Sequence, residues 1–347
     1  MKQQPPATLD RRSLLKSAGI LAAAGAVLPA HASAPTPQRG SETAPKADRL
    51  IRVAHLTDTH VQPERKAAEG LEATLAHVLA QADRPDVIIT GGDLIMDSFG
   101  ATRARTREQW DLFNRVFASC RVPVRHTIGN HDIWGWDKKK AGCRGDEAEW
   151  GKRWAVDELG LQRAHYTFAE RGVVFIVLDS VQPHGDDGYR GGLDDAQFEW
   201  LAGELARARG PVVVVSHIPI LHASLILSDS DARPDGKHVA PGELFMDCRR
   251  VTNLLARHPH VKAALSGHIH VVERLDYRGV AYINSGAVCG NWWKSQDPHK
   301  ARLTDPANTG NDIAPPRCEP GYGLIDVFTD GRIGFEYVET GWALASS

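Results

Sequence analysis

The polar residues that follow the apolar runs of this sequence constrain its fold more than any other feature. Five runs with the character of strands end on carboxylate, amide or imidazole side chains. These residues are Asp58 and His60, then Asp93, then Asn130 and His131, then His217, and finally His268 and His270. Because ligands of an open α/β sheet bind at the carboxyl ends of its strands, we expect these distant residues to meet in one place.

Apolar, β-rich runs alternate with segments of helical character over most of the chain. Strands are predicted at 49–58, 86–93, 122–130, 172–180, 212–217 and 261–268, and helices at 69–82, 106–119, 194–208 and 242–258. Hairpins are predicted at 273–285 and 321–339, the second turning at Asp330 and Gly331. The alternation predicts an α/β domain with a substantially parallel sheet.

Length and charge limit the classes of function. The 347 residues are 42% hydrophobic, enough to bury a substantial core in one large domain or two modest ones. The 41 basic and 43 acidic residues give a formal net charge of −2. This balance argues against a nucleic-acid polymer or an anionic membrane as the partner.

The N-terminal segment has the pattern of an export signal. Arg11 and Arg12 precede the apolar stretch GILAAAGAVLPA and the small residues AHA at 30–32. The pattern resembles a twin-arginine signal, which implies recognition by the twin-arginine export machinery and a periplasmic or secreted bacterial protein. We therefore predict a signal peptide over 1–32, a flexible linker over 33–48 and a single domain over 49–340. The alternative is a membrane anchor, but the apolar stretch is shorter than the roughly 20 residues that a span requires.

Cysteine spacing suggests no zinc or redox motif. The five cysteines are scattered without a CxxC pair. In an exported protein, Cys289 and Cys318 could form a disulfide across the polar stretch between them.

The residue types at the strand ends are those of a transition-metal site. Carboxylate, imidazole and amide donors without thiolates suit Mn, Fe, Zn or Co, and do not suit a structural zinc cage. Residues i and i+2 of an extended segment point to one side, so both members of DTH and of HIH can face one ion. These side chains offer too many donors for one tetrahedral ion, and they fit two divalent ions that share an aspartate. Such a centre keeps a net positive charge and attracts a phosphate ester.

The same blocks carry a family resemblance. DTH at 58–60, GGD at 91–93, GNHD at 129–132, SH at 216–217 and GHIH at 267–270 resemble, in order and spread, those of the calcineurin-like metallophosphoesterases. The resemblance spans roughly residues 50–290. It implies a four-layer α/β/β/α sandwich with a dinuclear centre of divalent or mixed-valence transition-metal ions at the strand ends.

The resemblance also implies a role for each site residue. Asp58, His60 and His270 would hold the first metal, Asn130, His217 and His268 the second, and Asp93 would bridge the two. A metal-bridging hydroxide would attack phosphorus directly. His131 would donate a proton or hydrogen bond to the leaving oxygen, and Asp132 would orient its ring.

Within this family, the sequence is most similar to the class III cyclic nucleotide phosphodiesterases and related glycerophosphodiesterases. Purple acid phosphatases place a metal-binding tyrosine where this chain has Met96, which argues against them. The phosphodiesterases commonly have HHP in the fourth block, whereas this chain has Ser216, His217, Ile218 and Pro219. The metal-binding histidine is therefore present, but the substrate is less firmly indicated.

We expect a small phosphodiester as the substrate, with a phosphomonoester as the alternative. Binding of a monoester dianion would be stabilised by several cations, whereas a single histidine is the only evident cation near the metals. A nuclease acting on long DNA or RNA is disfavoured by the near-neutral charge. A non-catalytic scaffold would show decayed ligand positions, and none of the seven is missing.

Other residues near the motifs have two open interpretations each. Aromatic side chains beside the motifs could stack on a nucleobase or sugar, or could pack at the rim; they are Trp134, Trp136, Trp292 and Trp293. His222 could line the pocket. Asp97 and Arg103 could contact substrate, although solvated surface positions are expected for both, and His55 and His126 are expected to be structural.

Overall fold

A computed structural model describes residues 48–186, 188–224, 239–294 and 318–342, together with the backbone of 232–233 and 236–237. The predicted signal peptide and nearly all of the predicted linker lie outside the described residues. The described residues all belong to one compact unit. Among the described residues, no helix has the length and apolar character that a membrane span requires.

The first of two large mixed sheets has the strand order β15-β14-β1-β2-β3. Its strands are β1 (Arg49–Leu56), β2 (Val87–Thr90), β3 (Val124–His126), β14 (Gly321–Phe328) and β15 (Ile333–Glu339). β1, β2 and β3 are parallel, whereas β14 pairs antiparallel with β1 and β15 antiparallel with β14. The carboxyl ends of β1, β2 and β3 therefore lie at one edge of this sheet.

The second sheet has the order β12-β13-β11-β8-β5-β4. Its strands are β4 (Tyr166–Glu170), β5 (Val173–Val177), β8 (Val212–Val215), β11 (Val261–Ser266), β12 (Val272–Tyr277) and β13 (Val280–Ser285). β5, β8, β11 and β13 are parallel, and β4 and β12 are antiparallel edge strands.

The apolar core lies between the two sheets and on their outer faces. Val53, Ile89, Val213 and Val215 belong to a buried cluster contributed by both sheets. Their chain neighbours Ala54, Ile88, Val212 and Val214 belong to a second cluster that includes helical residues such as Leu71, Phe113, Leu201 and Val251. Because successive strand residues point to opposite faces, strands covered on both faces read as continuous apolar runs.

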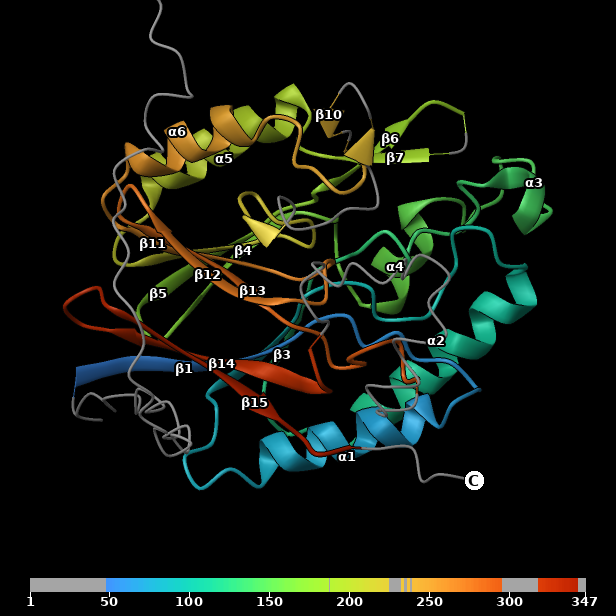
Figure 1. Ribbon diagram of the computed structural model, residues 1–347, viewed down its shortest axis with the longest axis horizontal. Helices are drawn as coiled ribbons and strands as arrows, with labels where there is room; N and C mark the ends of the chain where they lie inside the picture. Colours follow the sequence, from blue (N-terminus) through green and yellow to red (C-terminus); the bar gives the residue numbers. More distant parts are fainter. Residues whose placement is uncertain are drawn as a thin grey trace, which may run out of the picture. The chain divides into compact units, whose positions relative to one another are not determined.

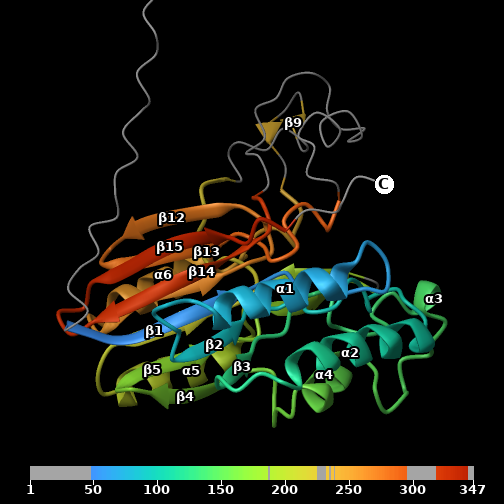
Figure 2. The same ribbon diagram turned by 90° about the horizontal axis from the view of Figure 1, so that it is seen from below.

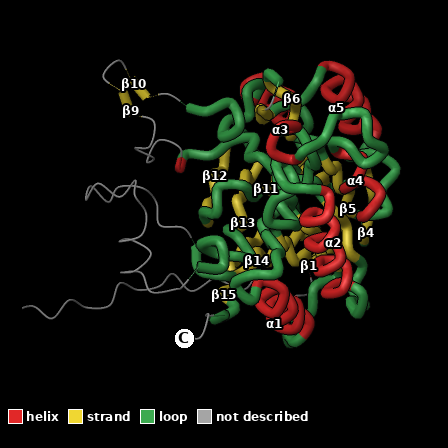
Figure 3. The backbone as a smooth tube through the Cα atoms, turned by 90° about the vertical axis from the view of Figure 1, so that its right-hand side faces the viewer, coloured by secondary structure: helices red, strands yellow, loops and turns green. Residues whose placement is uncertain are grey.

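Helices cover the outer faces, which completes four layers (Figure 1). α1 (Ala67–Leu79) and α2 (Arg103–Phe117) lie beside the first sheet, and α5 (Asp195–Arg207) and α6 (Cys248–Ala256) cover the second. α1 and α2 lie next to each other (Figure 2), and the strands lie between α1 and α5 (Figure 3). Side-chain caps define two of the helix starts: Thr102 accepts from Arg105 N, and Asp194 accepts from Gln197 N. The predicted α/β/β/α sandwich is confirmed.

Several element boundaries differ from the sequence prediction. β2 ends at Thr90 and β3 spans only three residues, so the polar residues of GGD and GNHD lie in loops beyond the strands. α6 begins at Cys248 and not at 242. The elements that the sequence did not predict are short: α3 (Lys138–Ala141), α4 (Lys152–Glu158), the edge strand β4, and the ribbons of β6 (Val181–His184) with β7 (Gly188–Gly191) and β9 (Ala232–Arg233) with β10 (Gly236–Lys237).

Candidate metal centre

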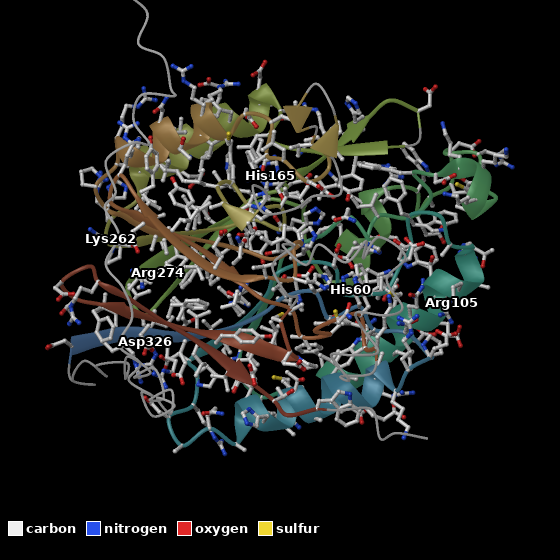
Figure 4. The ribbon with its side chains drawn as sticks, in the orientation of Figure 1. His60, Arg105, His165, Lys262, Arg274 and Asp326 are labelled. Carbon is white, nitrogen blue, oxygen red and sulfur yellow. The ribbon has the colours of Figure 1, made fainter. Side chains whose placement is uncertain are left out.

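The loops after β1, β2, β3, β8 and β11 bring the predicted ligands together. His60 lies at the opposite end of the sheets from Lys262, which is near the start of β11 (Figure 4). Asp58, His60 and His217 are fully buried, and Asp93, Asn130 and His270 nearly so. The expected convergence of these distant residues is thus present in the fold.

Left-handed backbone conformations, and not the extended segments predicted for DTH and HIH, turn these side chains toward one another, and His268 and His270 face different groups. Asp58, His60, Asp93, His268 and His270 have φ of 55°, 40°, 52°, 72° and 54°. Such conformations cost on the order of 1–3 kcal/mol per non-glycine residue and cluster at functional sites. Backbone hydrogen bonds from Asp58 N to Gly92 O (3.0 Å) and from His60 N to Asp93 O (3.0 Å) fix two of the turns.

One group of predicted metal ligands surrounds Asp58. The Nε2 atoms of His60 and His270 lie 3.2 Å apart, and His270 Nε2 lies 3.3 Å from Asp58 Oδ1. His60 Nε2 is 3.8 Å from the same oxygen. These residues are the three predicted to hold the first metal.

The second group surrounds His217. Its Nε2 lies 3.1 Å from Asn130 Oδ1 and 3.3 Å from His268 Nδ1. Asp93 Oδ2 joins the two groups, at 3.2 Å from His217 Nε2 and 3.6 Å from His60 Nε2. Asp93 is the residue predicted to bridge the two metals.

The chemistry of these atoms fits cations in both groups. His217 Nδ1 donates to Gly91 O (2.9 Å) and His270 Nδ1 donates to Gly290 O (3.0 Å), which leaves Nε2 of each neutral ring as a lone pair. Those lone pairs face carboxylate and amide oxygens, which are also acceptors. Acceptors buried against acceptors are unfavourable, so each of these contacts requires either a proton or a metal ion between its two atoms.

Burial and the contacts between aspartates and histidines shift the pKa values of the groups in the cluster. Burial lowers the pKa of His60 to about 4 and that of His268 to about 3. Burial alone would raise the pKa of Asp58, but the adjacent His270 and His60 hold it well below its usual range. Burial also opposes a charge on His217, yet the Asp93 carboxylate raises its pKa to about 9. The two carboxylates therefore stay ionised and attract positive charge.

Two glycines serve different purposes in these loops. Gly92 has φ of 93° and so permits the turn before Asp93. Gly267 allows its backbone to lie directly against Thr57 and Asp58, because a Cβ there would lie 1.8 Å from Thr57 Oγ1 and 2.2 Å from Asp58 Oδ2.

The prediction that Asp132 orients the ring of His131 is wrong. Asp132 is fully buried, and its carboxylate accepts hydrogen bonds from Leu94 N (2.7 Å), Ile95 N (3.2 Å) and Gly129 N (2.8 Å). These bonds tie the GNHD loop to the GGD loop. Asp132 thus shapes the backbone that presents Asp93 and Asn130.

Asp97 is the carboxylate nearest the ring of His131. Its Oδ1 lies 3.8 Å from His131 Nδ1, an atom that is buried and has no hydrogen-bond partner in the described structure. His131 Nε2 faces Asp93 Oδ2 at 4.0 Å, and the His131 side chain is 24% exposed. His131 is therefore, with His268, one of two partly exposed imidazoles in an otherwise buried cluster. The sequence analysis expected a solvated position for Asp97, which its 44% exposed side chain confirms, but did not pair it with His131; its position four residues after Asp93 was the only available signal.

The tryptophans near the motifs separate into two kinds. Trp134 and Trp293 are buried and donate from Nε1 to Ala101 O (3.0 Å) and Thr59 O (2.9 Å), respectively. Trp136 packs under Lys152 and Phe99. Only Trp292, of these four, lies against the cluster, with its ring centroid 4.2 Å from that of His60. Stacking on a ligand is thus contradicted for three of the four.

The remaining candidates lie outside the cluster. Arg103 pairs with Glu149 at the surface, and His222 contacts Ser224 Oγ at 3.1 Å. His55 and His126 bond within the fold, to Ser285 Oγ and Thr90 Oγ1. None of the five cysteines forms a disulfide, so the Cys289–Cys318 disulfide is absent.

This fold and site define a class of proteins. The chain belongs to the calcineurin-like phosphoesterase family, whose sequence profile matches residues 51–272. Together with the buried His/Asp clusters, this membership makes the protein a metal-dependent phosphoester hydrolase and rejects the scaffold hypothesis.

Individual relatives are similar over most of their length. The chain is 25% identical over 298 residues to the 3',5'-cyclic adenosine monophosphate phosphodiesterase CpdA of Escherichia coli (strain K12), covering 82% of this chain and 88% of the relative. It is 23% identical to the 3',5'-cyclic-nucleotide phosphodiesterase alr5338 of Nostoc sp., covering 81% and 89%. A solved dimetal phosphatase from Danio rerio shares the fold, with a TM-score of 0.55 at 16% identity over 84% of this chain and 98% of that chain.

Proposed function

We propose that the protein hydrolyses small phosphodiesters, with cyclic nucleotides as the substrate class. The observation that carries this proposal is the placement of the partly exposed imidazole of His131 beside a largely buried cluster of metal-capable acceptors. Similarity to cyclic nucleotide phosphodiesterases over more than four-fifths of the chain supports the substrate class.

Charge supports a diester over a monoester. Within the part of the chain that the structure describes, the ion-pair partners of Asp58 and Asp93 are all histidines. A diester monoanion needs less neutralisation than a monoester dianion. A site whose cations are confined to the bound metals therefore favours the diester.

The residues divide the work of hydrolysis between them. Two divalent ions would activate water and neutralise phosphoryl oxygens. The first would be held by Asp58, His60 and His270. The second would be held by Asn130, His217 and His268, and Asp93 would be shared by both. His131 would carry a proton on Nε2, the atom that faces the cluster, and donate it to the leaving oxygen. Asp97, on the Nδ1 side, would hold the ring in that orientation. The carbonyls of Gly91 and Gly290 fix the rings of His217 and His270.

A substrate panel tests this function. Purified protein supplied with Mn, Zn, Fe or Co should hydrolyse cyclic AMP or a glycerophosphodiester with a kcat/KM well above that for p-nitrophenyl phosphate. Preference for the monoester would make the protein a phosphomonoesterase on the same centre. Cleavage of plasmid DNA at a comparable rate would make it a nuclease.

We also propose that the protein reaches the periplasm or the exterior of a bacterial cell through the twin-arginine machinery. The supporting feature is the pair Arg11 and Arg12 before an alanine-rich apolar stretch.

Replacing Arg11 and Arg12 together by lysine should leave the precursor in the cytoplasm. Lysine keeps the positive charge and changes only the residues of the paired motif. Cell fractionation with an antibody to the protein measures the outcome, and the matched control is Lys2→Arg, which conserves charge outside the motif. Export of the double variant at the wild-type level would contradict the proposal.

A further inference from the structure

Trp292 lies across the imidazoles on one side of the candidate metal centre. Its ring centroid is 4.2 Å from that of His60, 4.7 Å from that of His270 and 5.6 Å from that of His131. The side chain is half-buried. One indole thus contacts two predicted metal ligands and adjoins the predicted proton donor.

The surrounding structure fixes this indole in place. Trp292 has a left-handed backbone with φ of 60°, and its carbonyl accepts a hydrogen bond from Arg65 Nη1 (2.9 Å). The next residue, Trp293, is buried, bonds to Thr59 O and packs so closely on Gly70 that a Cβ there would lie 2.3 Å from its ring. A strained conformation held by contacts on both sides is typical of a functional position.

The turn that carries Trp292 also supports a predicted ligand. Gly290 O accepts the hydrogen bond from His270 Nδ1 at 3.0 Å, and Trp293 N donates to Cys289 O at 2.9 Å. The indole and the imidazole of His270 therefore share one rigid frame. Placement of Trp292 relative to the metal ligands is consequently built into the fold.

The position of Trp292 points to the leaving group of the substrate. In the proposed function, His131 donates its proton to the leaving oxygen, so the group attached to that oxygen must lie beside His131. The indole adjoins His131 and is within reach of that group. An aromatic side chain binds a nucleobase by stacking, a contact that an aliphatic group such as glycerol cannot provide.

We propose that Trp292 is the specificity-determining residue of the site, an inference that rests on the proposed function. It selects phosphodiesters whose leaving oxygen belongs to a nucleoside over those with an aliphatic leaving group. It does so by stacking on the nucleobase.

Substitution of Trp292 tests this role. Trp292→Leu keeps an apolar side chain but removes the flat ring, and Trp292→Phe keeps a smaller ring. The ratio of kcat/KM for cyclic AMP to that for glycerophosphocholine should fall on the order of tenfold to a hundredfold in the leucine variant, and less in the phenylalanine variant. Trp200→Leu, on α5 where the ring packs against His165, is the matched control and should keep the wild-type ratio.

A binding measurement separates recognition from catalysis. Isothermal titration should show that the leucine variant weakens the affinity for AMP relative to that for glycerol 3-phosphate by a similar factor. Equal losses for both ligands, or loss of bound metal in both Trp292 variants, would show that the indole only supports the metal ligands and would overturn the inference. If the wild-type protein cleaves diesters but the ratio is unchanged in Trp292→Leu, the inference is wrong and the proposed function stands. If the wild-type protein cleaves no diester, both fall.

Discussion

Replacing Asp93 by asparagine should reduce kcat/KM for the preferred diester on the order of a thousandfold or more and should weaken binding of both metals. Asp93 Oδ2 faces both groups of predicted ligands, at 3.2 Å from His217 Nε2 and 3.6 Å from His60 Nε2. An amide has the same shape but lacks the charge that the metals require. Lewis-acid stabilisation is worth several kcal/mol, and each 1.36 kcal/mol is tenfold in rate. Initial rates and metal analysis measure both effects.

The same chemical change elsewhere provides the control for Asp93. Asp111 is exposed on α2, so Asp111→Asn should keep the wild-type rate and metal content. Loss of one metal with full retention of the other in Asp93→Asn would refute the bridging role of Asp93.

Replacing His131 by alanine should lower kcat on the order of 10²- to 10⁴-fold while the protein keeps its metals. His131 is 24% exposed, and its Nε2 lies 4.0 Å from Asp93 Oδ2, farther from this oxygen than the Nε2 atoms of His217 (3.2 Å) and His60 (3.6 Å). Removal of its ring should therefore remove the proton donor and leave the metal ligands in place. Steady-state rates with cyclic AMP and metal analysis of the same preparation measure the two quantities.

The leaving group distinguishes a proton donor from a merely structural histidine. Bis(p-nitrophenyl) phosphate has a leaving group that needs little protonation, so the loss in His131→Ala should be much smaller for it than for cyclic AMP. Asp97→Asn should show the same substrate dependence with a smaller loss. His258→Ala, before the start of β11 and remote from the strand ends that carry the site, is the control. Equal losses on both substrates would contradict the assignment of His131 as a proton donor.

The convergence of the ligands was predictable because it depends on topology. Parallel strands covered on both faces leave a clear apolar pattern, and their carboxyl ends must share an edge. Polar residues directly after those runs, such as Asp58 and Asp93, could therefore be placed together from the sequence. Their motifs also identified the family, which the profile match over 51–272 confirms.

The contacts of individual side chains were not predictable in the same way. Asp132 follows His131 in the chain, yet its carboxylate points to the backbone of Leu94 and Ile95. Asp97 is instead the neighbour of the ring. Such pairings depend on loop conformations with left-handed residues, which are uncommon outside glycine and which the apolar pattern does not report.

Close packing also decided which tryptophans reach the site. Trp292 and Trp293 are adjacent in the sequence, but one adjoins the imidazoles and the other fills the core against Gly70. No spacing rule separates two neighbouring residues in an irregular turn. The helix start at Cys248 and the short ribbon of β6 with β7 likewise depend on tertiary contacts that periodicity does not report.

The metal content of the purified wild-type protein, measured by mass spectrometry beside its diesterase activity, tests the central claim most directly. We predict close to two transition-metal ions per chain, with activity that is lost on chelation and restored by adding metal back. A metal-free protein that hydrolyses the diester at the undiminished rate would contradict the claim that these distant residues surround a pair of catalytic cations.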